Sequence, residues 1–172
     1  IRDLVRSRGL GDVYKRQKGD KMKKRLTLTL NQELSKNILK SKADVLVVGV
    51  NEGRTLNSSA KEIDSATNGS IKELMKRGEF EAKVGQTAYI ATNEGTKADR
   101  IFLIGVGKSN TALNNEDMDK ISSSVTSVLT SKKSAVGLVA LPAMKYDSKD
   151  HSDSSLLQKL GTSLESKSYT YD

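Results

Sequence analysis

Hydrophobic and polar positions along the chain follow two different periods. Residues 25–30 alternate one by one between polar and apolar side chains, which predicts a half-buried strand. Residues 44–50, 100–105 and 135–141 form nearly continuous apolar runs, which are typical of strands covered on both faces. Residues 86–91 predict one more strand, and their short link to 100–105 indicates a hairpin between the two.

Apolar residues between these strands recur at helical spacings of three and four. Ser59 and Glu62 match a capping box, which predicts that a helix starts there. Further helices are expected over residues 70–77, from 114 or 115 to about 131, and over 153–166. Alternating strands and helices predict an α/β domain with a mixed, mostly parallel sheet and helices on both of its faces.

The composition limits the class of protein. The chain has 172 residues, a size that suits one domain. It has no cysteine, which excludes disulfides and cysteine-ligated zinc. The longest apolar stretch, residues 135–144, contains Pro142 and is too short to span a bilayer, so we expect a soluble protein.

The charge is concentrated at the start of the chain. Residues 1–21 carry seven bases and three acids, which is half of the formal net charge of +8. A basic arm of this kind can meet nucleic acid. However, residues 1–17 resemble translated adapter sequence, so we treat residues 1–21 as a non-native leader and expect the native start at Met22. Without this leader, the case for a nucleic-acid partner loses most of its force.

Two candidates for chemistry have structural explanations. His151, the only histidine, lies in a polar run and fits a solvated loop residue. Gly105 to Lys108, a Gly-Val-Gly-Lys segment, follows a strand and forms a candidate phosphate-binding turn. It lacks the spacing of a Walker motif and of a G-x-G-x-x-G motif, and glycines at strand ends often only permit a turn.

The acidic side chains of the predicted helices also suggest structure rather than catalysis. Carboxylates spaced along an exposed helix face are usually partners of nearby lysines. Here they are Glu62, Asp64, Glu73 and Glu79. No G-x-S-x-G elbow occurs. From the residues alone we assign no catalytic, cofactor-binding or metal-ligating side chain.

Several blocks of sequence resemble one known family. The blocks at residues 43–50, 85–87 and 98–108, in this order and spacing, resemble the N-terminal domain of the leucyl (cytosol) aminopeptidases. Residues 56–80 also fit, and residues 168–172 are similar to the segment just before that family's interdomain connection. The resemblance covers about residues 22–172.

This resemblance implies a macro-domain-like, three-layer α/β fold. It also implies a cytoplasmic, hexameric parent enzyme that removes N-terminal residues, often leucine, from peptides by means of two divalent metals such as zinc or manganese. Those metal ligands belong to a C-terminal catalytic domain, whose N-T-D-A-E-G-R signature does not occur here. The resemblance therefore implies a chain without catalytic or metal residues, inactive alone, that packs beside its own catalytic domain and supports the oligomer.

Two alternatives remain open at this point. One is a free-standing macro-like module that binds a nucleotide or ADP-ribose and uses Gly105 to Lys108 for the phosphate. The other is an accessory domain that binds nucleic acid, as the pI of about 9.6 suggests.

Overall fold

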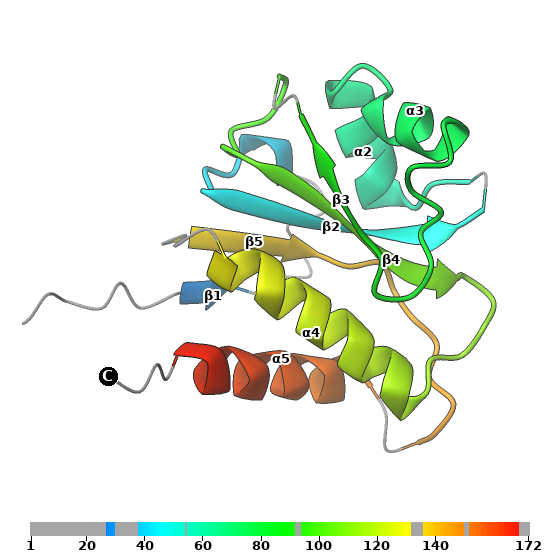
Figure 1. The fold of residues 1–172 in the computed structure, drawn as a ribbon, viewed down its shortest axis with the longest axis vertical. Coiled ribbons are helices and arrows are strands. Elements are labelled where there is room, and N and C mark those ends of the chain that lie inside the picture. Colours follow the sequence, from blue (N-terminus) through cyan, green and yellow to red (C-terminus); the bar gives the residue numbers. More distant parts are fainter. Residues whose placement is uncertain are drawn as a thin grey trace, which may run out of the picture.

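A five-stranded mixed sheet forms the centre of the domain (Figure 1). The computed structural model describes residues 27–29, 38–53, 55–91, 94–131, 136–149 and 152–168. The predicted leader and His151 lie outside these residues. The strands are β1 (Thr27–Thr29), β2 (Val45–Glu52), β3 (Thr87–Ile90), β4 (Ile101–Lys108) and β5 (Val136–Ala140).

The strand pairing confirms the predicted mixed sheet. The order across the sheet is β1-β5-β2-β4-β3. The pairs β1–β5, β5–β2 and β2–β4 are parallel. Only β3 runs antiparallel to its neighbour, and it pairs Thr87 with Ile104 and Ile90 with Ile101 on β4. Residues 86–91 and 100–105 therefore pair as expected, at one edge of the sheet.

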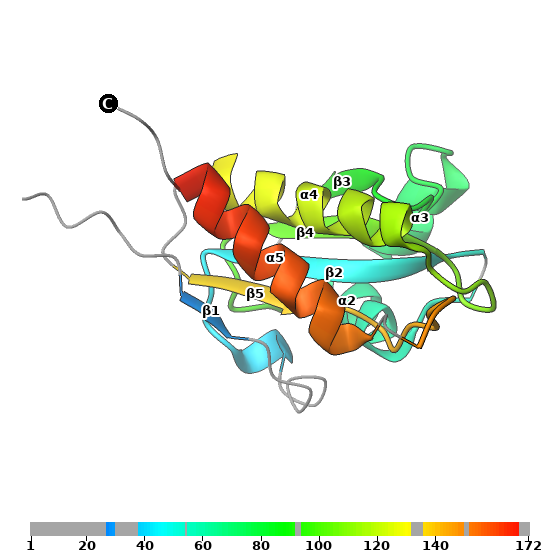
Figure 2. The same ribbon diagram turned by 90° about the horizontal axis from the view of Figure 1, so that it is seen from below.

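Helices cover both faces of this sheet. A short 3-10 turn, η3 (Ile38–Lys40), lies between β1 and β2 in the chain. Two helices, α2 (Ser58–Ala66) and α3 (Ser70–Lys76), lie between β2 and β3. The helices α4 (Asn115–Ser131) and α5 (Asp153–Ser168) follow β4 and β5. Figure 2 shows α4 and α5 side by side on one face of the sheet. Among the described residues, no helix combines the length and the apolar character needed to cross a membrane.

The central strand β2 shows why both faces must be covered. Leu46 and Val48 are fully buried in the core that includes Ile63 of α2. Val45 and Val47 are buried in a second core that includes Val125 of α4. Successive strand residues point to opposite faces, so a continuous valine-rich run requires a helix layer on each side.

One predicted helix start is wrong and another is confirmed. The side chain of Asn57, not Ser59, caps α2, because its Oδ1 accepts a hydrogen bond from the backbone N of Ala60 at 2.8 Å. The predicted start of α4 is confirmed by a reciprocal pair. Asn114 Oδ1 accepts from the N of Asp117 at 2.9 Å, and Asp117 Oδ2 accepts from the N of Asn114 at 3.3 Å.

Candidate functional site

The edge formed by the carboxyl ends of the parallel strands is the first place to look for a site. In open α/β sheets, ligands bind where neighbouring strands lead to helices on opposite faces. Here β2 leads to α2 on one face, and its neighbour β5 leads to α5 on the other. Its other parallel neighbour, β4, leads to α4 on that same second face, so the switch point lies at the carboxyl end of β2, on both of its sides.

On the β5 side of this switch point, the chain itself passes close to β2. After β5, Leu141 and Pro142 pass so close to β2 that only glycine fits opposite them. A Cβ at Gly49 would lie 2.7 Å from Pro142 Cδ and 2.9 Å from Leu141 Cδ2. Real Cβ atoms do not approach other atoms this closely, so side chains of the chain occupy this part of the switch point.

Two asparagine amides at the same edge hold the loop after β2 in place. The Nδ2 of Asn57 donates to the carbonyl of Gly49 at 2.7 Å and to Asn51 Oδ1 at 3.3 Å. The Nδ2 of Asn51, a residue that is only 9% exposed, donates to the carbonyl of Gly107 at 3.4 Å. These polar groups thus link the ends of β2 and β4, and they satisfy one another.

The predicted phosphate-binding turn is part of a strand. Gly105 and Lys108 lie within β4, which ends at Lys108. The N–H of Gly105 donates to the carbonyl of Gln86 at 2.7 Å, and the N–H of Gly107 donates to the carbonyl of Ala82 at 3.1 Å. A phosphate cradle needs backbone N–H groups that are free to point at the ligand. The expectation of a turn here is therefore wrong, because residues 82–86 pair with this segment.

Of the four acidic side chains that we considered as catalytic candidates, Glu62 is half-buried on α2, and the other three have structural partners. Asp64 is buried, and its Oδ1 accepts from the N–H groups of Ile71 at 3.0 Å and Lys72 at 3.1 Å, which caps α3. Glu73 and Glu79 form ion pairs with Arg77 on the surface.

No metal-binding group emerges from these side chains. The part of the chain that the structure describes contains no group of three or more His, Cys, Asp or Glu side chains that could hold a metal ion. The described residues therefore do not fit a metal centre.

Ion pairs on the surface shift the pKa values of three side chains, Lys83, Glu116 and Lys120. The hydrogen bond from Lys120 lowers the pKa of Glu116, and the same bond raises the pKa of Lys120. The neighbouring Glu81 likewise raises the pKa of Lys83. Each shift favours the charged form that the group already has at neutral pH, so none of them prepares a general acid or base.

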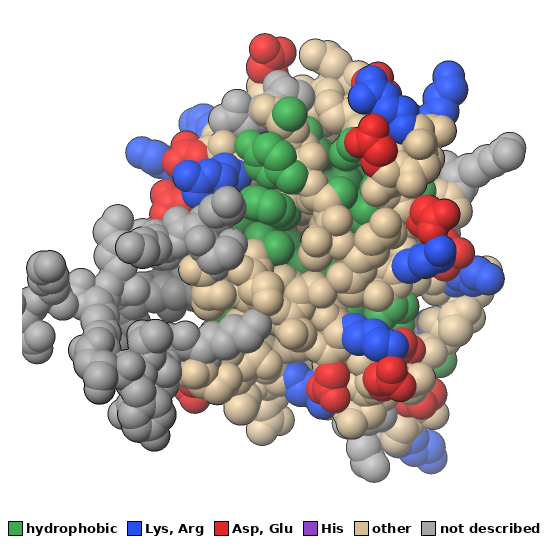
Figure 3. Space-filling model, in the orientation of Figure 1, with side chains coloured by type: hydrophobic (Ala, Val, Ile, Leu, Met, Phe, Trp, Pro, Cys, Tyr) green, Lys and Arg blue, Asp and Glu red, His purple; other side chains and the backbone are tan. Residues whose placement is uncertain are grey.

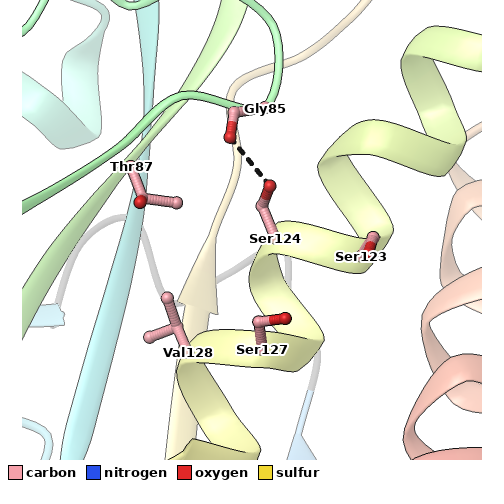
Figure 4. A pocket seen from close by; sticks show the side chains of 6 residues that line it. All are labelled: Gly85, Thr87, Ser123, Ser124, Ser127 and Val128. Atoms are coloured by element: carbon pink, nitrogen blue, oxygen red, sulfur yellow. Dashed lines mark hydrogen bonds between the residues drawn. The ribbon is translucent and has the colours of Figure 1, made fainter.

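A shallow hollow of about 360 Å³ lies between the start of β3 and α4 (Figure 4). The hydroxyl of Ser124 donates to the carbonyl of Gly85 at 2.8 Å and closes one end. None of the lining side chains titrates near neutral pH, so the hollow has no means of acid–base catalysis. The residues that line the hollow are Gly85, Thr87, Ser123, Ser124, Ser127 and Val128. Sequence reasoning missed this hollow, for which the run of serines was the only signal.

Comparison with solved structures supports the fold. The chain is similar to the macrodomain of Mycobacterium tuberculosis DarG, with a TM-score of 0.58. The match covers 83% of this chain and 92% of that one, at 15% sequence identity. This likeness shows a macrodomain-like three-layer fold, as expected from the sequence.

Comparison with known sequences shows the family. The chain is 38% identical over 117 residues to the cytosol aminopeptidase of Pseudomonas aeruginosa strain PAO1, which is 67% of this chain and 23% of that protein. It is 31% identical over 131 residues to the probable cytosol aminopeptidase of Pseudomonas fluorescens strain Pf0-1, which is 76% of this chain and 26% of that protein. The match thus spans about a quarter of these relatives. Because residues 47–172 match the N-terminal domain of the cytosol aminopeptidase family, the chain belongs to that family.

Proposed function

We propose that this chain is the non-catalytic N-terminal domain of an aminopeptidase that removes N-terminal residues, often leucine, from peptides in the cytoplasm. The observation that carries the proposal is the family match over residues 47–172. The role of the domain is structural. It packs beside the catalytic domain of its own chain and supports a homo-oligomer. The family resemblance implies that this oligomer is a hexamer.

The site geometry supports a role without catalysis. Side chains of the chain lie over the switch point at Gly49, and the amides of Asn51 and Asn57 bond to the protein itself. The described residues also lack any cluster that could hold a divalent metal. The family resemblance implies that two metals such as zinc or manganese are held by a separate catalytic domain, where they would activate water and polarise the scissile carbonyl.

A direct assay tests the absence of catalysis. The purified chain is incubated with leucine p-nitroanilide and added manganese or zinc, with the Pseudomonas aeruginosa enzyme as the positive control. We expect p-nitroaniline to be released no faster than in a control that contains the metal and the substrate but no protein. Activity that follows this chain through purification would contradict a non-catalytic role.

A domain exchange tests the structural role. Residues 47–172 replace the matching segment of the Pseudomonas aeruginosa enzyme, and a second variant lacks that segment. We expect the exchanged enzyme to retain the oligomeric state and a kcat/KM within about tenfold of the parent, a change of about 1.4 kcal/mol in transition-state stabilisation. We expect the deletion to lose both. Equal loss in the two variants would contradict the proposal.

A further inference from the structure

The strand β3 forms one edge of the sheet that the structure describes. It is the last strand in the order, and none of the described strands pairs with its outer side. Its four residues, Thr-Ala-Tyr-Ile, include no charge and no proline. Soluble proteins normally protect such edges with lysine, proline, a bulge or a covering element. The strand is short and a bulge at Gly85 precedes it, but no charge or proline within β3 prevents it from pairing with another strand.

The hydrogen-bond phase of the β3–β4 ladder shows which groups point outward. Bonded pairs alternate along an antiparallel ladder. The hydrogen bond from Gly105 N to Gln86 O at 2.7 Å makes Gln86 and Gly105 a bonded pair, so every second residue of β3 after Gln86 is also bonded to β4. Ala88 and Ile90 therefore direct their N–H and C=O groups toward β4. The N–H and C=O groups of Thr87 and Tyr89 point to the open edge.

Thr87 and Tyr89 lie on one face of β3, where the ring of Tyr89 is exposed and Thr87 borders the hollow. Tyr89 is 48% exposed, and its ring lies on Phe102 with 5.1 Å between the ring centroids. Figure 3 shows hydrophobic side chains exposed over the part of the sheet formed by β3 and β4. Thr87, two residues earlier on the same face, lines the hollow below α4 together with Ser127 and Val128 (Figure 4).

We propose that β3 binds β3 of a second copy of this chain, antiparallel and about a two-fold axis at Ala88. In this register Thr87 of each copy lies opposite Tyr89 of the other. Because both residues direct their backbone groups outward, each pair exchanges two hydrogen bonds. The tyrosine ring of each copy then lies beside Thr87 of the other copy, at the open side of the hollow.

A second copy fits this edge better than an unrelated strand. A two-fold interface requires that one patch carry both complementary features, and here Tyr89 and the hollow lie two residues apart on one strand. Directly opposed like charges destabilise strand pairs, and neither β3 nor the hollow carries a charged side chain. The uncharged edge is thus compatible with itself.

The size of the interface sets the expected affinity. A standard interface buries about 800 Å² on each partner. Two four-residue strands and two tyrosine rings bury less than this. We therefore expect a reversible dimer that forms at high protein concentration. This inference concerns the chain alone and does not rest on the proposed function.

Sedimentation equilibrium of the full chain from about 10 μM to 1 mM tests the proposal. We expect a monomer–dimer equilibrium that Tyr89→Ala weakens at least tenfold. The matched control is Val136→Ala, which trims the other large hydrophobic residue that is exposed among the described residues, 43% exposed on β5, and leaves the equilibrium unchanged. A chain that stays monomeric at 1 mM, or a dimer unaffected by Tyr89→Ala, would overturn the proposal.

A cysteine at the two-fold axis tests the register independently. Ala88 would face its own copy in a non-bonded pair, in which Cα atoms lie about 4.5 Å apart. A disulfide spans this distance, and the chain has no other cysteine. We expect oxidised Ala88→Cys to form a covalent dimer, which the added Tyr89→Ala change reduces. Thr162→Cys, exposed on α5, is the control and stays monomeric. Equal cross-linking of the two cysteine variants, or none at position 88, would overturn the register.

Discussion

Gly105 approaches the backbone of Lys83 so closely that no side chain fits between them. A Cβ at Gly105 would lie 2.0 Å from the carbonyl oxygen of Lys83 and 2.5 Å from the carbonyl carbon of Ala82. This approach lets the segment before β3 pair with the end of β4 and occupy the N–H groups of Gly105 and Gly107. The glycines that suggested a phosphate-binding turn therefore serve strand pairing.

The first prediction is that Gly105→Ala destabilises the domain by about 2–3 kcal/mol, because the new Cβ must displace the backbone of residues 82–83. Urea unfolding followed by circular dichroism measures the change. Gly161→Ala is the control, since nothing lies within 4 Å of its Cβ in the interior of α5. That change is expected to stabilise the helix by up to about 1 kcal/mol. Equal stability of the two variants would contradict the close contact.

A second prediction concerns ligands with phosphate groups. Titration calorimetry of the chain with ADP-ribose is expected to show no binding heat, because the candidate N–H groups of Gly105 and Gly107 already bond to Gln86 and Ala82. Inorganic phosphate provides a parallel titration. Micromolar binding of ADP-ribose that Lys108→Ala abolishes would restore the nucleotide-binding alternative.

The third prediction separates the two roles of Asn57. Asn57→Ala removes both the cap of α2 and the donor to Gly49, and we expect a loss of about 1–2 kcal/mol in unfolding free energy. Asn57→Asp keeps the capping oxygen but sets a carboxylate oxygen against the carbonyl of Gly49 and against Asn51 Oδ1, so we expect a loss at least as large as for Asn57→Ala. Ser59→Ala, at the position where the sequence pattern predicted the cap, should cost less than either. Chemical denaturation of the three variants gives the order, and Ser59→Ala as the most damaging change would contradict it.

The fourth prediction concerns the Glu116–Lys120 pair on α4. The pKa of Glu116 is lowered from 4.5 and that of Lys120 is raised from 10.5 by their hydrogen bond. A lowered acid pKa adds stability above pH 4.5 that is lost as the pH falls through the folded pKa. A raised lysine pKa adds stability below pH 10.5 that is lost as the pH rises through the folded pKa. The pair is thus at full strength between these two pH values.

Carbon-detected NMR titration of Glu116 in the unmodified chain and in Lys120→Gln checks the pair. We expect the variant to raise the pKa of Glu116 toward 4.5, because the bond that lowers it is gone. Glu116 lies on the exposed first turn of α4, so the fold should not change. An identical pKa in both proteins would show that the pair does not form in solution.

The sequence pattern predicted the sheet and the helices because those elements depend on local periodicity. The apolar run at residues 44–50 could be identified as a strand covered on both faces, and Val45 to Val48 are indeed fully buried. The helical spacing of apolar residues also predicted a helix from residue 114 or 115 to about 131, and Ile121 and Val125 of this helix, α4, are buried. Hydrophobic spacing determines which face of an element is buried, so these features are readable from sequence.

The site could not be predicted because its contacts join residues far apart in the chain. The donor from Asn57 to Gly49 and the contact of Gly49 with Pro142 depend on the tertiary arrangement. The same is true of the hollow between Thr87 and α4. A local pattern at Ser59 and Glu62 matched a capping box, but Asn57 has partners on both sides and takes that role.

The genomic reading frame on both sides of this chain tests the proposed function most directly. We predict that sequencing the source locus will show native coding sequence from Met22 and a frame that continues past Asp172 into a domain with the N-T-D-A-E-G-R signature. Such a result would join this domain to a two-metal catalytic domain. A stop codon directly after Asp172, with residues 1–21 encoded by the same gene, would contradict the assignment as the N-terminal part of an aminopeptidase.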